Sequence, residues 1–160
     1  MRFLENQEKD IALRLIERAL EIAKSSKCER SMCGSIVVSN GEIIEEGFNS
    51  PPLHLEAQKR CFKSKKELNE KITDKTCCVH AEQRAIIDAL KKNPGKLVGS
   101  TIYFIRLNGR GAMEFAGKPY CTICSKMALD VGIKNFVLYH EKGIGVYNTD
   151  EYNLLSYSYQ

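Results

Sequence analysis

Apolar and polar residues recur along this chain with two periods, which predict helices and strands. Residues 6–27 carry apolar side chains at helical spacing on one broad stripe, so we expect an amphipathic helix packed on a sheet. Residues 33–39 are typical of a strand and 42–47 of its return, and between them Asn40-Gly41 is a strong signal for a two-residue hairpin turn. The sheet is therefore expected to begin with an antiparallel pair.

The second half of the chain alternates between the two patterns. Residues 81–90 and 121–131 have helical spacing, and Gly132 ends the second of these helices. Strands are expected at residues 100–106 and 134–139, a flexible excursion at 108–118, and a fifth strand or a terminal helix after Gly143. This order of elements predicts an α/β sandwich whose later strands are parallel.

Composition narrows the class of protein. A chain of 160 residues, 43% hydrophobic and without a long apolar run, fits one domain over residues 1–160 and no membrane span. The polar start lacks the apolar core of a signal peptide, and an odd set of seven cysteines favours a reducing compartment, so we expect a cytoplasmic enzyme. A net charge of +4 is weak evidence for nucleic-acid binding, which is not favoured, but it agrees with an anionic substrate.

Candidate chemistry lies where the two later helices begin. His80 and Glu82 are two residues apart at one start, and Cys121 and Cys124 supply two thiols at the other. A zinc ion with three protein ligands keeps one position for water, which is typical of a catalytic site. Glu82 is too near His80 in sequence to be the fourth ligand, so we expect it to move protons at that water. Cys-x-x-Cys alone is often a structural or redox pair, but the joint pattern favours a functional metal site.

His-Ala-Glu at residues 80–82, followed by Pro-Tyr-Cys-x-x-Cys at 119–124, resembles the zinc-dependent cytidine and deoxycytidylate deaminase superfamily. Tyr120 is a departure, because the family usually has proline directly before the first cysteine. The resemblance implies a three-layer α/β/α sandwich with a mixed, mostly five-stranded sheet, one catalytic zinc and a homo-oligomer.

Two substrate contacts follow from the same resemblance. Residues 47–52 are similar to the Gly-Tyr-Asn-Gly-x-Pro segment of deoxycytidylate-type deaminases, which implies that Asn49 contacts the sugar of the substrate. An asparagine before prolines is also typical of an ordinary turn. The resemblance places the peptide N–H of Ala81 at the carbonyl group of the base.

The segment of residues 50–77 is a basic insert, which also resembles deoxycytidylate deaminases. A short helix is expected at residues 55–68, and one or two of the basic side chains are expected to hold a 5′-phosphate while the others face solvent. A second, structural zinc is a question raised by Cys28, Cys33, His54, Cys61, Cys77 and Cys78. Their spacing contains no clean paired pattern, so we expect buried free thiols instead.

The leading function is hydrolytic deamination of a cytosine nucleotide or nucleoside, with dCMP favoured. The same chemistry on transfer-RNA adenosine, guanine or a riboflavin-pathway pyrimidine stays open, as does a non-catalytic zinc-stabilised partner subunit. Glu82 argues against the last of these, because a structural metal site has no use for that carboxylate.

Overall fold

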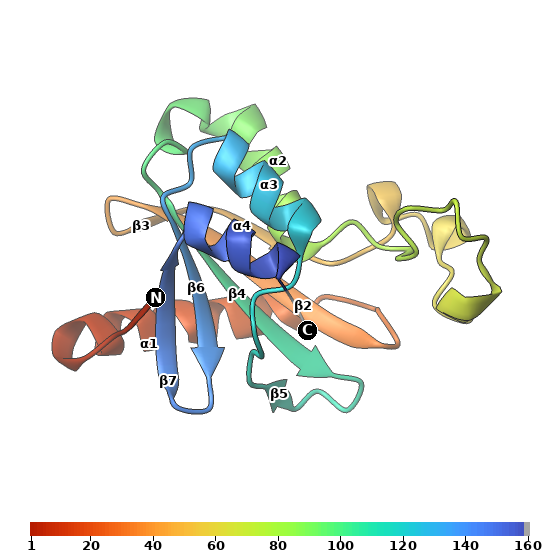
Figure 1. The fold of residues 1–160 in the computed structure, drawn as a ribbon, viewed down its shortest axis with the longest axis horizontal. Coiled ribbons are helices and arrows are strands. Elements are labelled where there is room, and N and C mark those ends of the chain that lie inside the picture. Colours follow the sequence, from red (N-terminus) through yellow and green to blue (C-terminus); the bar gives the residue numbers. More distant parts are fainter. Residues whose placement is uncertain (159–160) are drawn as a thin grey trace.

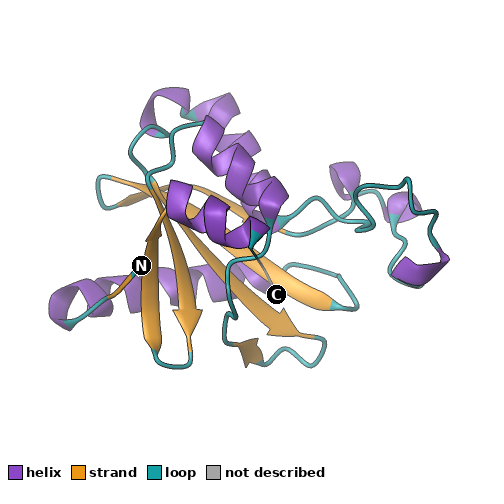
Figure 2. Cartoon of the chain, viewed as in Figure 1, coloured by secondary structure: helices purple, strands orange, loops and turns teal. Residues whose placement is uncertain are grey.

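The computed structural model describes residues 1–158, which build helices on both faces of one twisted sheet (Figures 1 and 2). The helices are α1 (Asn6–Ala23), α2 (Ala81–Lys92), α3 (Thr122–Asp130) and α4 (Thr149–Tyr157). The strands are β1 (Arg2–Phe3), β2 (Ser31–Ser39), β3 (Glu42–Phe48), β4 (Thr101–Asn108), β5 (Met113–Glu114), β6 (Asn135–His140) and β7 (Gly143–Asn148). None of the helices within residues 1–158 is long and apolar enough to span a bilayer.

The sheet has the strand order β1-β7-β6-β4-β2-β3, and β5 pairs with β4 at one end. Strands β4 and β6 are parallel, as the intervening helix α3 predicts, whereas the other strand pairs within residues 1–158 are antiparallel. The three-layer sandwich is therefore confirmed. The expectation of parallel later strands is wrong for β6 and β7, which a short hairpin connects. The seven-stranded sheet is larger than the five strands expected, because the short strands β1 and β5 carry no pattern of their own.

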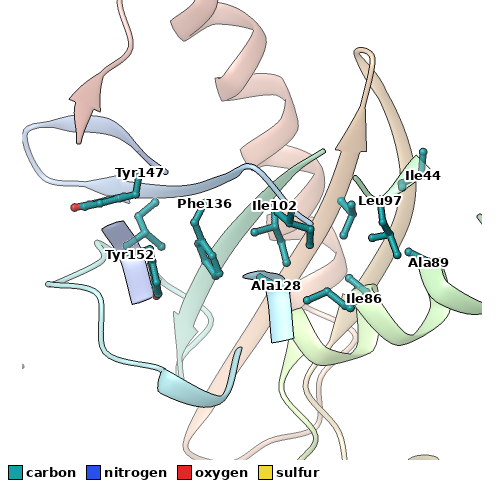
Figure 3. Close-up of a cluster of buried hydrophobic side chains, with 13 residues drawn as sticks. Ile44, Ile86, Ala89, Leu97, Ile102, Ala128, Phe136, Tyr147 and Tyr152 are labelled. Carbon is teal, nitrogen blue, oxygen red and sulfur yellow. The ribbon is translucent and has the colours of Figure 1, made fainter. Parts of the chain in front are cut away.

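Successive side chains of the central strands point to opposite faces of the sheet and contribute to two hydrophobic cores. On one face Ile36 and Val38 of β2 pack against α1. On the other face Val37 belongs to a cluster with α2, α3 and α4, whose centre is shown in Figure 3. There the ring of Phe136 stacks on that of Tyr152 with 4.0 Å between centroids, which fastens α4 to β6.

Two glycines let helices approach the sheet closely. A Cβ atom on Gly34 of β2 would lie 2.1 Å from the carbonyl oxygen of Ala19 in α1. On the opposite face, a Cβ atom on Gly47 of β3 would lie 2.4 Å from the carbonyl oxygen of Ala81. Because Ala81 is the first residue of α2, this contact sets the height of that helix start above the sheet.

The prediction of a helix at residues 55–68 is wrong. The segment between β3 and α2 contains only short 3-10 turns, at Pro52–His54, Glu56–Gln58 and Lys65–Glu67, and extends to one side of the sheet (Figure 1). None of residues 51–77 is buried, and Leu55 and Phe62 are exposed. Without an apolar face to bury, a helix of this length has little to stabilise it.

The excursion expected at residues 108–118 is partly an ordered hairpin. Strand β4 continues to Asn108, whose side-chain oxygen accepts hydrogen bonds from the backbone N–H groups of Arg110 and Ala112. The chain then returns as β5, and Glu114 pairs with Arg106 of β4 at 2.7 Å. Both alternatives for the tail are present, because β7 is followed directly by α4.

Candidate metal centre and active site

The two helix starts meet at one point, and each contributes its capping residue. His80 immediately precedes α2, and its N–H donates to the side chain of Gln83 at 3.0 Å. Cys121 immediately precedes α3, and its sulfur accepts from the N–H of Cys124 at 3.4 Å. The positive ends of both helices therefore face the same small volume, which favours thiolates there.

The three candidate ligands lie together. His80 Nδ1 is 3.2 Å from Cys124 Sγ and 3.3 Å from Cys121 Sγ. Ideal tetrahedral zinc at usual bond lengths would separate a ligating nitrogen and sulfur by about 3.6 Å, so the donor set fits zinc with a small outward movement. A tetrahedral zinc ion held by these three residues would have one position for a non-protein ligand.

The charges of this cluster are strongly coupled. Hydrogen bonds from Cys124 and from His80 lower the pKa of Cys121 to about 4 against the cost of burial. The hydrogen bond to Cys121 raises the pKa of His80 to about 9, and the pKa of Cys124 lies well above its ordinary value because Cys121 is the preferred thiolate. Binding of a metal in this place would therefore release protons from His80 and Cys124.

Glu82 is a buried carboxylate beside these ligands, with only 4% of its surface exposed. Burial, followed by repulsion from the Cys121 thiolate, raises its pKa to about 7. A carboxyl group with a pKa near neutrality can both accept and donate a proton under physiological conditions.

His80, Cys121 and Glu82 line a cavity of about 580 Å³, whereas Cys124 is fully buried and lies outside the lining. This size lies within the range for small-molecule sites. Two other predicted residues line it: Asn49 and Ala81. Ala81 is the first residue of α2, where N–H groups have no partner inside the helix. The bridge between Ser50 and Val79 brings the end of β3 beside His80.

Asn49 is held firmly by the neighbouring strand. Its side-chain oxygen accepts from the N–H of Cys33 at 2.7 Å, and its side-chain nitrogen donates to the carbonyl of Ser31 at 3.0 Å. An amide group has a second lone pair and a second N–H, so these bonds fix its direction and still leave capacity for a ligand. Its contact with substrate remains a prediction.

The cavity wall also carries four cations, of which Lys65 belongs to the basic insert at residues 50–77 where the sequence predicts a phosphate contact. The others are Arg30, Arg106 and Lys118. Arg106 interrupts the apolar pattern of β4, and this was a signal that could have been read. Arg30 is brought in by tertiary structure, because it lies in a loop 50 residues before His80, whereas Lys118 directly precedes the metal motif at residues 119–124 and could have been noted from the sequence.

Comparison with known proteins agrees with this geometry. Residues 9–140 match the family model described as the cytidine and deoxycytidylate deaminase zinc-binding region, so the chain belongs to that family. It is therefore a zinc-dependent hydrolytic deaminase. A search of curated proteins finds no match.

Solved structures share the fold. Deoxycytidylate deaminase from cyanophage S-TIM5, in complex with dCMP and dUMP, is similar with a TM-score of 0.57 and 24% identity over 83% of this chain and 82% of that one. Its apo form gives a TM-score of 0.53 and 22% identity over the same shares. Cytidine deaminase from Burkholderia pseudomallei has a TM-score of 0.53 and 18% identity over 88% and 94% of the two chains.

Proposed function

We propose that this protein deaminates a cytosine nucleotide, with dCMP as the favoured substrate, to the uracil nucleotide and ammonia. The observation that carries the proposal is one cavity lined by His80 and Cys121 of the donor set, by the buried Glu82 and by four cationic side chains, with Cys124 completing the donor set beside it. Zinc bound by these three residues would supply a water nucleophile at neutral pH, because it lowers the pKa of water to about 7.

Glu82 performs the proton transfers. Its carboxylate accepts a proton from the attacking water and delivers it to ring nitrogen N3 as the water oxygen bonds to C4. It then passes the second water proton to the exocyclic amine, and the C4–N bond breaks to release ammonia. A pKa near 7 suits a group that alternates between these two states.

The base and the sugar are oriented by backbone and amide groups. The N–H of Ala81 donates to the carbonyl oxygen of the base, and the remaining capacity of the Asn49 amide is directed at the sugar. Both residues line the cavity that contains Glu82. These contacts would hold C4 near the water without taking part in the proton transfers.

The cationic wall favours a substrate with a phosphate over a free nucleoside. Arg30, Lys65, Arg106 and Lys118 all line the cavity. Glu114 partly compensates Arg106 through their ion pair, so the wall keeps a positive excess. Within the insert, Lys65 is the basic residue that lines the cavity, in line with a role for one or two of its cations.

The test is an ammonia-release screen of the zinc-loaded protein with dCMP, CMP, deoxycytidine, cytidine, adenosine, guanine and a transfer-RNA anticodon stem. We expect dCMP or CMP to react far faster than the matching nucleoside. Lys118→Met should raise KM for dCMP and leave KM for deoxycytidine unchanged. Lys71 is exposed and outside the cavity wall, so Lys71→Met should change neither. Release only from a purine or the RNA stem would overturn the choice of substrate.

The proposal also covers the cellular compartment and the oligomeric state of the protein. We place this single deaminase domain in the cytoplasm, where its seven free thiols would stay reduced. Self-association into a homo-oligomer is supported by exposed apolar side chains on α3 and α4, at Leu129, Leu154, Leu155 and Tyr157. Light scattering after size-exclusion chromatography measures the number of subunits.

A further inference from the structure

Four cysteines that are dispersed in sequence gather at the base of the insert. Cys28 follows α1, Cys61 lies within the insert, Cys77 ends it, and Cys78 follows directly, two residues before His80. The Sγ atoms of Cys28, Cys61 and Cys78 all lie within 4.8 Å of one another. Cys77 Sγ lies outside that group of three, but it is 3.4 Å from Cys61 Sγ and 3.7 Å from Cys78 Sγ, so it needs only to approach Cys28 to become a fourth ligand.

These separations suit a shared metal ion better than a disulfide. Four sulfurs at the usual Zn–S bond length around a tetrahedral zinc would be about 3.8 Å apart, close to the spacings of Cys77 from its two neighbours. A disulfide would require about 2.0 Å between its sulfurs. All four cysteines are free thiols.

The cluster is distinct from the catalytic donor set. His80, Cys121 and Cys124 form a separate group, and the two groups have no residue in common. Cys33 belongs to neither group, and its sulfur contacts the Ser31 hydroxyl at 3.9 Å. His54, which the sequence places among the candidate ligands, lies against the ring of Phe48 at 5.4 Å.

The insert needs a cross-link of this kind because it has no core. None of residues 51–77 is buried, and Leu53 and Phe62 are 80% and 76% exposed. Short segments that bury too little apolar surface are commonly fixed by a structural metal, whose binding energy becomes folding energy. The four thiols join the insert to the end of α1 and to the start of α2.

We propose that Cys28, Cys61, Cys77 and Cys78 bind a second, structural zinc ion that fixes the insert as a wall of the substrate cavity. All four cysteines line that cavity, together with Arg30 and Lys65. Loss of this ion would release the wall while leaving the catalytic donor set intact. The consequence is weaker substrate binding with the chemistry preserved.

Metal analysis of the purified protein, prepared under reducing conditions with zinc and then desalted, tests the site. We expect two zinc ions per chain in the wild type and one in Cys61→Ser or Cys77→Ser. The Cys33→Ser control, which removes a thiol of the same cavity outside the cluster, should retain two. Cys121→Ser should lose the catalytic ion and keep the other, so this result does not depend on whether the enzyme acts on dCMP.

Two further readouts identify the ligands and their role. Cobalt substituted into Cys121→Ser should give the intense thiolate charge-transfer absorption of a four-sulfur site, and this absorption should weaken in Cys121→Ser/Cys77→Ser. Trypsin should cut the insert of Cys61→Ser faster than that of Cys33→Ser, and KM should rise more than kcat falls. One zinc per chain in the wild type, or a Cys61–Cys77 disulfide in the reduced preparation, would overturn the proposal.

Discussion

Replacement of Gly47 by alanine tests whether the distance between β3 and α2 controls the active site. The added Cβ would lie 2.4 Å from the Ala81 carbonyl oxygen and 2.6 Å from the Ala85 nitrogen, both backbone atoms. Because Cβ contacts under 3.0 Å are essentially never seen and ordinary contact begins at 3.4 Å, the start of α2 must retreat by about 0.6 to 1.0 Å. That movement carries His80, Ala81 and Glu82 with it.

The expected costs follow from this displacement. Overpacking of this kind destabilises a protein by about 1–3 kcal/mol or more. A displacement near 1 Å at reacting groups lowers catalysis by about 100-fold. We therefore expect Gly47→Ala to lose both stability and most of its activity per folded molecule, with weaker zinc binding at His80.

The matched control is Gly34→Ala on the other face of the sheet. Its Cβ would meet the Ala19 carbonyl oxygen at 2.1 Å and the Ala23 nitrogen at 2.7 Å, so the clash is at least as severe but acts on α1. Urea denaturation gives the folded fraction, and ammonia release from dCMP is then expressed per folded molecule. The reasoning is refuted if Gly47→Ala keeps wild-type activity, or if Gly34→Ala loses as much.

Two further substitutions test individual residues. Burial raises the pKa of Glu82 to about 7 from an ordinary value of 4.5, so the wild type binds a proton more tightly when folded and loses stability as pH rises between these values. In metal-free protein, Glu82→Gln should therefore be more stable than the wild type by about 3 kcal/mol above pH 7 and equally stable below pH 4.5. Urea titrations at several pH values measure this difference in the free energy of unfolding. A difference that is independent of pH would contradict the reasoning. Asn49→Ala removes two hydrogen bonds to β2, so it should lower stability by about 1–3 kcal/mol. It should also raise KM for dCMP. An unchanged KM in folded protein would show that Asn49 does not contact the substrate.

Local sequence patterns predicted the parts of the molecule that depend on local chemistry. The Asn40-Gly41 turn, the apolar stripe of α1 and the placement of His80 and Cys121 at helix starts all appear as expected. Each of these features depends on neighbours within a few residues. The metal ligands could be identified because their residue types are chemically demanding and their order is fixed.

Features that depend on distant contacts were not visible in the sequence. The thiol cluster joins Cys28 to Cys61 and Cys78, which no spacing rule connects. Strand β5 is two residues long and exists because it pairs with β4, and Arg30 reaches the cavity only through the packing of its loop. The insert does not form the expected helix, because its apolar residues do not pack against a surface of the domain.

The most direct test of the central claim compares the zinc-loaded wild type with Glu82→Gln in ammonia release. The account predicts that the wild type releases ammonia from dCMP, and that Glu82→Gln keeps its fold and zinc content while its rate falls by about 10²–10⁴-fold. Equal rates in the two proteins, or no ammonia from any cytosine substrate with the wild type, would contradict it.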